Sequence, residues 1–131
     1  MTPTPPLPRG LLLSDDLIFV SRITATARAV GLTVTSARNT ATLIESARTV
    51  SPTAVILDLQ NPGLELPALL ASLRELSPTM PRVTAYGSHV DTETLKAARK
   101  AGCDRVMPRS QFVKELETGI AEWLEPKPDS Q

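Results

Sequence analysis

AVILDLQNPG, at residues 54–63, decides the fold, because an apolar run leads directly into a carboxylate and a turn. Residues 54–57 are apolar at every position, which is typical of a strand buried on both faces of a parallel sheet. Asp58 follows the run, and proline and glycine at residues 62–63 then indicate a loop. This stretch predicts a central strand that delivers an acidic side chain to the edge of a sheet.

The rest of the chain repeats a short apolar run followed by an amphipathic stretch. We expect further strands at residues 11–13, 32–35, 82–86 and 104–107. A helix follows each of the five strands, and the pattern is (βα)₅. It predicts an α/β fold of the doubly wound, flavodoxin-like type: a single domain with a five-stranded parallel sheet, covered by helices on both faces.

Capping residues mark the ends of the predicted helices. Gly31 and Gly102 are expected C-terminal caps, whereas Asn39, Asp91 or Thr92, and Ser110 are expected N-terminal caps. In the first helix, apolar residues at helical spacing predict the inward face, and these are Val20, Ile23, Ala27 and Val30. Residues 10–124 then form the domain, and the Pro-rich residues 1–9 and residues 125–131 are predicted to be disordered tails.

The composition argues against several classes of function. Lys and Arg number 14, and Asp and Glu also number 14, so the formal net charge is zero. This balance argues against a general electrostatic binder of nucleic acid or of an anionic membrane. No run reaches the roughly 20 apolar residues of a membrane span, and no signal peptide is recognisable. With one cysteine and no disulfide framework, we expect a cytoplasmic protein.

Charged residues follow several of the predicted strands. Asp15 and Asp16 come after the first strand, Asp58 after the third and Arg109 after the fifth. The carboxyl ends of parallel strands meet at one edge of the sheet, where the functional crevice of such folds lies. Three carboxylates and one guanidinium should therefore converge there, although a single carboxylate such as Asp16 could equally be a helix cap.

Three segments carry a resemblance to a known family. LLLSDD at residues 11–16, VILDLQNPG at 55–63 and AARKAGCDRV at 97–106 resemble, in order and spacing, the receiver domain of response regulators (the CheY-like superfamily). The resemblance covers residues 10–124. It implies a stand-alone two-component signalling domain that is not an enzyme, and it implies that Asp58 accepts a phosphoryl group.

The resemblance also implies a Mg²⁺ site. Its ligands would be Asp15, Asp58 and the carbonyl of Gln60, with Asp16 as an additional acidic group. Counting back from Gly31 aligns the family's acidic pair with Ser14 and Asp15, and a shift of one residue aligns it with Asp15 and Asp16. The register is left open at this point.

Several positions depart from the family's pattern. The hydroxyl residue that contacts the phosphoryl group is replaced by Gly87, with Ser88 next to it. The lysine is replaced by Arg109, which could bind phosphoryl oxygens or lie over Asp58 as a permanent ion-pair partner. The aromatic position falls on Val106, so Tyr86 could replace it in function or simply pack at the sheet edge.

These departures leave two main hypotheses. The first is a receiver phosphorylated on Asp58 with Mg²⁺ by a histidine kinase or phosphotransfer protein. The alternative is a pseudo-receiver, an interaction module that is not phosphorylated. A flavodoxin-like small-molecule binder is a third reading. No DNA-binding domain follows residue 124, so we expect output through an effector protein.

The expected partner face combines the fourth helix, the fifth strand and the fifth helix, and homodimerisation through it is a further hypothesis. It would present Lys96, Arg99, Lys100, Arg105, Lys114 and Glu117. Elsewhere, His89 with Asp91 and Glu93 could suggest a second metal site, and a surface histidine in a capping turn is the simpler interpretation.

Overall fold

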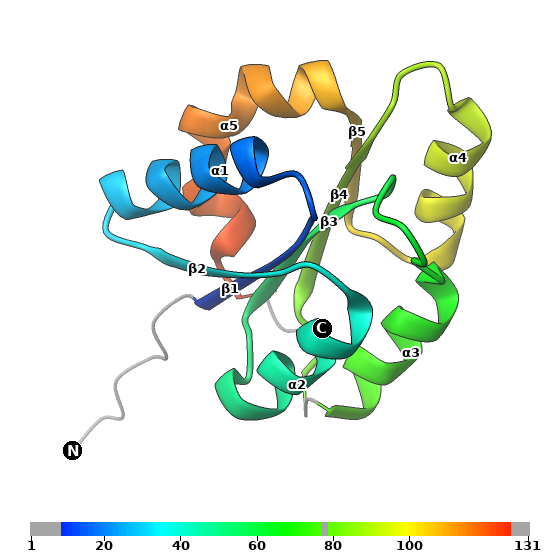
Figure 1. The fold of residues 1–131 in the computed structure, drawn as a ribbon, viewed down its shortest axis with the longest axis horizontal. Coiled ribbons are helices and arrows are strands. Elements are labelled where there is room, and N and C mark those ends of the chain that lie inside the picture. Colours follow the sequence, from blue (N-terminus) through cyan, green and yellow to red (C-terminus); the bar gives the residue numbers. More distant parts are fainter. Residues whose placement is uncertain (1–8, 77–78, 127–131) are drawn as a thin grey trace, which may run out of the picture.

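The computed structural model describes residues 9–76 and 79–126. Its strands form one parallel sheet in the order β2-β1-β3-β4-β5 (Figure 1). The strands are β1 Arg9–Leu13, β2 Thr33–Ala37, β3 Ala54–Asp58, β4 Arg82–Gly87 and β5 Arg105–Pro108. This is the flavodoxin-like order, in which the chain reverses direction across the sheet between β1 and β3. The predicted single α/β domain is confirmed.

Five helices cover the two faces of the sheet. On one face lie α1 Leu17–Ala29 and α5 Arg109–Leu124, and on the other α2 Thr40–Val50, α3 Leu66–Leu76 and α4 Thr92–Ala101 (Figure 1). All five residues of β3 are buried, as the apolar run predicts. Val55 and Leu57 point into the core under α2, α3 and α4, whereas Ala54 and Ile56 point into the core under α1 and α5.

Most of the expected caps are present. The Asn39 side chain accepts a hydrogen bond from the backbone of Thr42, and Asp91 does the same from Thr94. Gly102 has a φ of 113°, in the left-handed region that favours glycine. The prediction for Ser110 is wrong. The fifth helix begins at Arg109, so the N-cap position falls on Pro108, two residues before Ser110, and no side chain caps it.

Two further expectations need correction. Arg9 belongs to β1 rather than to the tail, because it pairs in register with Thr33. Val30 is 48% exposed, since the helix ends before it and it lies off the inner face. Phe19, in line with Ile23 and Ala27, occupies that face instead. Of the predicted tails, residues 1–8 and 127–131 lie outside the described residues.

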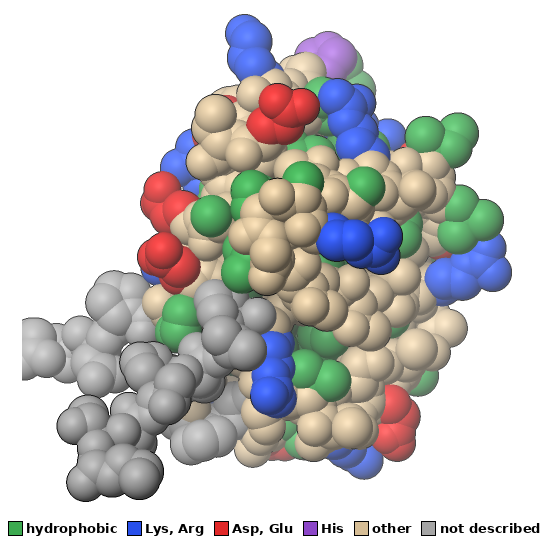
Figure 2. All heavy atoms as spheres, turned by 90° about the vertical axis from the view of Figure 1, so that its left-hand side faces the viewer, with side chains coloured by type: hydrophobic (Ala, Val, Ile, Leu, Met, Phe, Trp, Pro, Cys, Tyr) green, Lys and Arg blue, Asp and Glu red, His purple; other side chains and the backbone are tan. Residues whose placement is uncertain are grey.

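The described residues include no membrane-spanning helix, and the face drawn in Figure 2 carries charges of both signs. Within the described ranges, no helix is both long and apolar enough to cross a bilayer. On the face drawn in Figure 2, basic and acidic side chains are interspersed, with hydrophobic side chains in small separate spots. A long single-sign stripe of the kind that binds nucleic acid is not visible on that face.

Gly119 gives a test of how tightly the Trp123 ring packs along α5. A Cβ at this position would lie 2.7 Å from the Cζ2 atom of Trp123, whose ring stacks on Phe112 at 4.9 Å. Gly119→Ala gains about 1 kcal/mol of helix propensity but overpacks a buried ring, at a cost of about 1–3 kcal/mol. We expect a net loss of unfolding free energy in urea. Thr118→Ala, at the exposed neighbouring position, should be neutral or stabilising, and a stabilised Gly119→Ala would contradict the packing.

Candidate functional site

The site centres on Asp58, the last residue of β3. It is 2% exposed, and both carboxylate oxygens have partners. The backbone N–H of Gln60 donates to Oδ1 at 2.9 Å, and the Ser14 hydroxyl donates to Oδ2 at 3.2 Å. The Nη2 atom of Arg109 lies 3.6 Å from the same Oδ2, at ion-pair rather than hydrogen-bond distance. The structure therefore brings Asp58 and Arg109 together, as one of the two sequence readings expected.

The segment after β1 uses its polar residues in three different ways. Ser14 is fully buried, and its hydroxyl also accepts the backbone N–H of Asp16 at 3.1 Å. Asp16 caps α1 by accepting the N–H of Phe19 at 3.1 Å. Asp15 lies between them and is exposed. Ser14 therefore takes the place facing Asp58, and the cap reading of Asp16 is correct.

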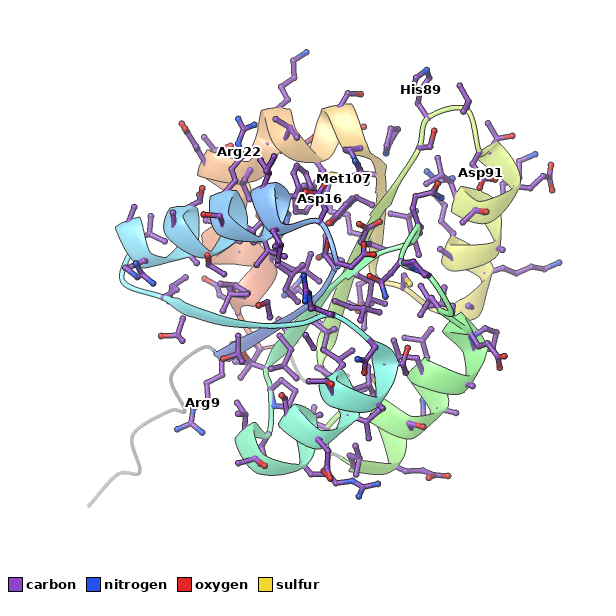
Figure 3. The ribbon with its side chains drawn as sticks, viewed as in Figure 1. Arg9, Asp16, Arg22, His89, Asp91 and Met107 are labelled. Atoms are coloured by element: carbon purple, nitrogen blue, oxygen red, sulfur yellow. The ribbon has the colours of Figure 1, made fainter. Side chains whose placement is uncertain are left out.

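Arg109 occupies the space between the two carboxylates. Its Nη1 atom is 4.0 Å from Oδ2 of Asp16, while Nη2 faces Asp58. Figure 3 shows Asp16 at the start of α1, at the carboxyl edge of the sheet. The guanidinium carbon also lies 5.3 Å from the ring centre of Phe19 and 5.7 Å from that of Tyr86. A cation this close to two aromatic rings is further stabilised by their quadrupoles.

Asp15, Asp58 and Gln60, with Asp16, were the expected metal ligands, and this arrangement does not fit Mg²⁺. Among the residues that the structure describes, no three His, Cys, Asp or Glu side chains are grouped so that they could hold a metal ion. Mg²⁺ prefers an octahedral shell of oxygens. Here a guanidinium lies between the carboxylates of Asp16 and Asp58. A metal would require Arg109 to leave.

Tyr86 lies under the site rather than at a sheet edge, which corrects one expectation. It is fully buried on an inner strand, with its ring 5.0 Å from Phe19 and 4.5 Å from Phe112. Burial, and next the negative charge of Asp58, raise the pKa of the Tyr86 hydroxyl far above its usual range, so it stays protonated. Ser14 and the positive charge of Arg109 lower this pKa in part. The Tyr86 hydroxyl itself makes no hydrogen bond of good geometry within the described chain.

The positions that hold a hydroxyl residue and an aromatic residue in the family pattern are occupied here by Gly87 and Val106. Gly87 is buried, and a Cβ there would touch Leu59 and Leu95 at an ordinary 3.4 Å. The Ser88 hydroxyl accepts the backbone N–H of Val90 at 3.3 Å, within its own loop. Val106 packs partly buried against the core under α4. The described site thus has no side-chain hydroxyl after β4 facing Asp58.

The loop after β4 is outside this arrangement. His89 is exposed and projects from the tip of the loop (Figure 3). Asp91 caps α4, and hydrogen bonds from the Thr94 side chain and backbone lower the pKa of its carboxyl. A metal group of His89, Asp91 and Glu93 is not formed among the described residues.

Phe19 is the site residue that the sequence reasoning missed. Its ring and that of Tyr86 lie beside the Arg109 guanidinium. The signal was present in the sequence, because Phe19, Ile23 and Ala27 recur at four-residue spacing on one helix face.

The comparisons with known proteins support the fold. No protein-family profile matches the chain, and no curated protein sequence matches it. Solved structures match over most of its length. The receiver domain of the TMAO respiratory response regulator TorR is 20% identical, with a TM-score of 0.76, covering 89% of this chain and 95% of that one. The receiver domain of NtrX from Brucella abortus is 19% identical, with a TM-score of 0.74, covering 88% and 97%.

A third similar structure contains a partner. It is the Saccharomyces cerevisiae co-crystal structure of the histidine phosphotransfer protein Ypd1 and the receiver domain of its downstream response regulator Ssk1. It matches at 17% identity and a TM-score of 0.75, covering 91% of this chain and 90% of that one. At such identities the likeness shows the fold. The chain has the fold of response-regulator receiver domains.

Removing the guanidinium tests how far Asp58 depends on it. Arg109→Met keeps an apolar stem over the aromatic rings but leaves the carboxylate, 3% exposed, without a cation. We expect a loss of about 1–3 kcal/mol in unfolding free energy, measured by urea denaturation. Arg105→Met is the matched control, since Arg105 is similarly exposed (45% against 42%) but pairs with Glu115, which is 33% exposed. That variant should lose under about 0.5 kcal/mol. Equal losses in the two variants would contradict this role.

Proposed function

We propose that this chain is a receiver-like signalling domain that acts through protein–protein contacts, and that Arg109 closes its Asp58 site in place of Mg²⁺ and a phosphoryl group. The observation that carries the proposal is the ion pair from Arg109 to a buried carboxylate whose two oxygens are already hydrogen-bonded. Of the two main sequence hypotheses, this favours the pseudo-receiver.

Phosphoryl transfer to a carboxylate makes three demands, and Arg109, Ser14 and Gly87 each bear on one of them. The nucleophilic oxygen must be in line with the incoming group, a cation must neutralise the phosphoryl charge, and donors must face its equatorial oxygens. Arg109 lies on the Oδ2 atom of Asp58, and Ser14 stands where a metal-binding acid would be. Gly87 carries no hydroxyl to meet a phosphoryl oxygen.

A specific observation also supports a second candidate, a receiver that is phosphorylated after Arg109 withdraws. The Arg109 side chain is 42% exposed, so it could leave Asp58 without disrupting the core. In that case a histidine kinase or phosphotransfer protein would be the upstream partner, as Ypd1 is for Ssk1 in the solved complex.

Incubation with acetyl phosphate and Mg²⁺, followed by intact-mass analysis, separates the two candidates. We expect no phosphoryl adduct under conditions that label an ordinary receiver domain. An adduct on the native chain that is absent from Asp58→Asn would establish the second candidate and overturn the first.

A restored site provides the positive control. The triple variant Ser14→Asp, Gly87→Thr, Arg109→Lys supplies the missing acid, hydroxyl and lysine. The space around Gly87 accepts the added Cβ, because its neighbours Leu59 and Leu95 would be at 3.4 Å. An adduct in the triple variant alone would show that Asp58 is correctly placed and that these side chains block its chemistry.

The output surface is proposed to be the face formed by α4, β5 and α5. Five of its six named residues are basic: Lys96, Arg99, Lys100, Arg105 and Lys114, with Glu117 the acidic one. This face suits an acidic effector protein better than a second copy of itself, because like charges would oppose each other across a two-fold axis. Light scattering after size exclusion should therefore show monomer at low salt. A dimer that Lys100→Glu strengthens would place a self-interface there.

A further inference from the structure

A cavity lies toward the amino ends of β4 and β5, away from the Asp58 edge. Its volume is about 200 Å³, and it is bounded by the sheet below and the end of α5 above. The lining residues are Arg82, Thr84, Asp104, Arg105, Glu122 and Trp123. The Asp58 site uses none of them, and of these residues only Arg105 also belongs to the proposed output surface.

The floor of this cavity contains a buried hydroxyl without a partner. Thr84 is 1% exposed, and its Oγ1 atom makes no hydrogen bond to the described part of the chain. Buried polar atoms are almost always hydrogen-bonded, because an unsatisfied one loses its hydration without compensation. Thr84 lines the cavity from β4, so a molecule at the base of the cavity would lie against the residue whose hydroxyl has no partner among the described residues.

The walls carry balanced charge. Arg82 and Arg105 supply two cations, and Asp104 and Glu122 supply two carboxylates. The Asp104 carboxylate already accepts the backbone N–H of Val83 at 2.7 Å, which leaves Glu122 as the anionic group for a ligand. Arg82 donates a hydrogen bond to the backbone carbonyl of Glu125, and Arg105 donates one to the carboxylate of Glu115. A guanidinium has five N–H donors, so both groups keep donors for a ligand. A ligand with both charges matches these walls better than a simple anion or cation.

We propose that this cavity binds a small zwitterion of the α-amino acid class. The ligand carboxylate pairs with the guanidinium groups of Arg82 and Arg105, and its ammonium pairs with Glu122. The Thr84 hydroxyl bonds to the ligand at the base, and the indole of Trp123 covers its carbon atoms. A cavity of about 200 Å³ has room for a ligand as small as serine.

Trp123 makes the proposal directly measurable, because it is the single tryptophan of the chain. Intrinsic fluorescence is titrated with L-serine, with lactate (carboxylate without ammonium) and with ethanolamine (ammonium without carboxylate). We expect a saturable change with L-serine at a dissociation constant below about 1 mM, and at least about tenfold weaker responses to the other two. No saturable response to L-serine up to about 10 mM would overturn the proposal and leave a cavity that holds only water.

Substitutions test whether the fluorescence change comes from binding in this cavity. Thr84→Val keeps the side-chain shape but removes the hydroxyl, and it should weaken binding about three- to tenfold. Glu122→Gln should weaken it further, whereas Glu117→Gln, on the same helix outside the cavity, should not change it. Unchanged binding in both Thr84→Val and Glu122→Gln would overturn the proposed site. Asp58→Asn should bind normally, so this result is independent of the proposed signalling function.

Discussion

The carboxyl edge of the sheet is organised around one buried carboxylate, that of Asp58 at the end of the central strand β3. Such a charge costs several kcal/mol of free energy unless it is hydrogen-bonded and paired. Asp58 obtains its partners from three separate parts of the chain: Ser14 after β1, the backbone of Gln60 after β3, and Arg109 at the start of α5. Satisfying one carboxylate therefore fixes the relative positions of these three segments.

Two aromatic rings beside the site explain why an arginine suits position 109. A lysine ammonium is a compact, strongly hydrated charge, whereas a guanidinium is planar and stacks on aromatic rings. Phe19 and Tyr86 provide those rings. The Tyr86 ring in turn contacts the ring of Phe112, which stacks on Trp123 of the same helix, α5. Packing thus holds Arg109 where it neutralises Asp58, so the charge of this site is balanced by the chain itself.

The limits of sequence reasoning are visible at particular residues. Asp91 was one of two candidate caps with Thr92, and Asn39 was predicted correctly as a cap, because a cap is a local hydrogen bond within four residues. Ser110 was not, because the start of α5 depends on where β5 stops, at Pro108 paired with Gly87 on a neighbouring strand. For Tyr86 the sequence left two possibilities, packing at the sheet edge or replacing the aromatic position, because the strand order that makes β4 an inner strand is not a local property.

By itself, the sequence determined the alternation of strands and helices, the burial of β3 and the delivery of Asp58 to its end, since hydrophobic periodicity and turn residues act over short distances. It also supplied both candidate roles for Arg109 but could not choose between them. Only the tertiary structure decided that choice, and it decided that Ser14 rather than Asp15 faces Asp58. The physical reason is that contacts between residues more than 40 positions apart depend on how the helices pack across the sheet, which no local pattern specifies.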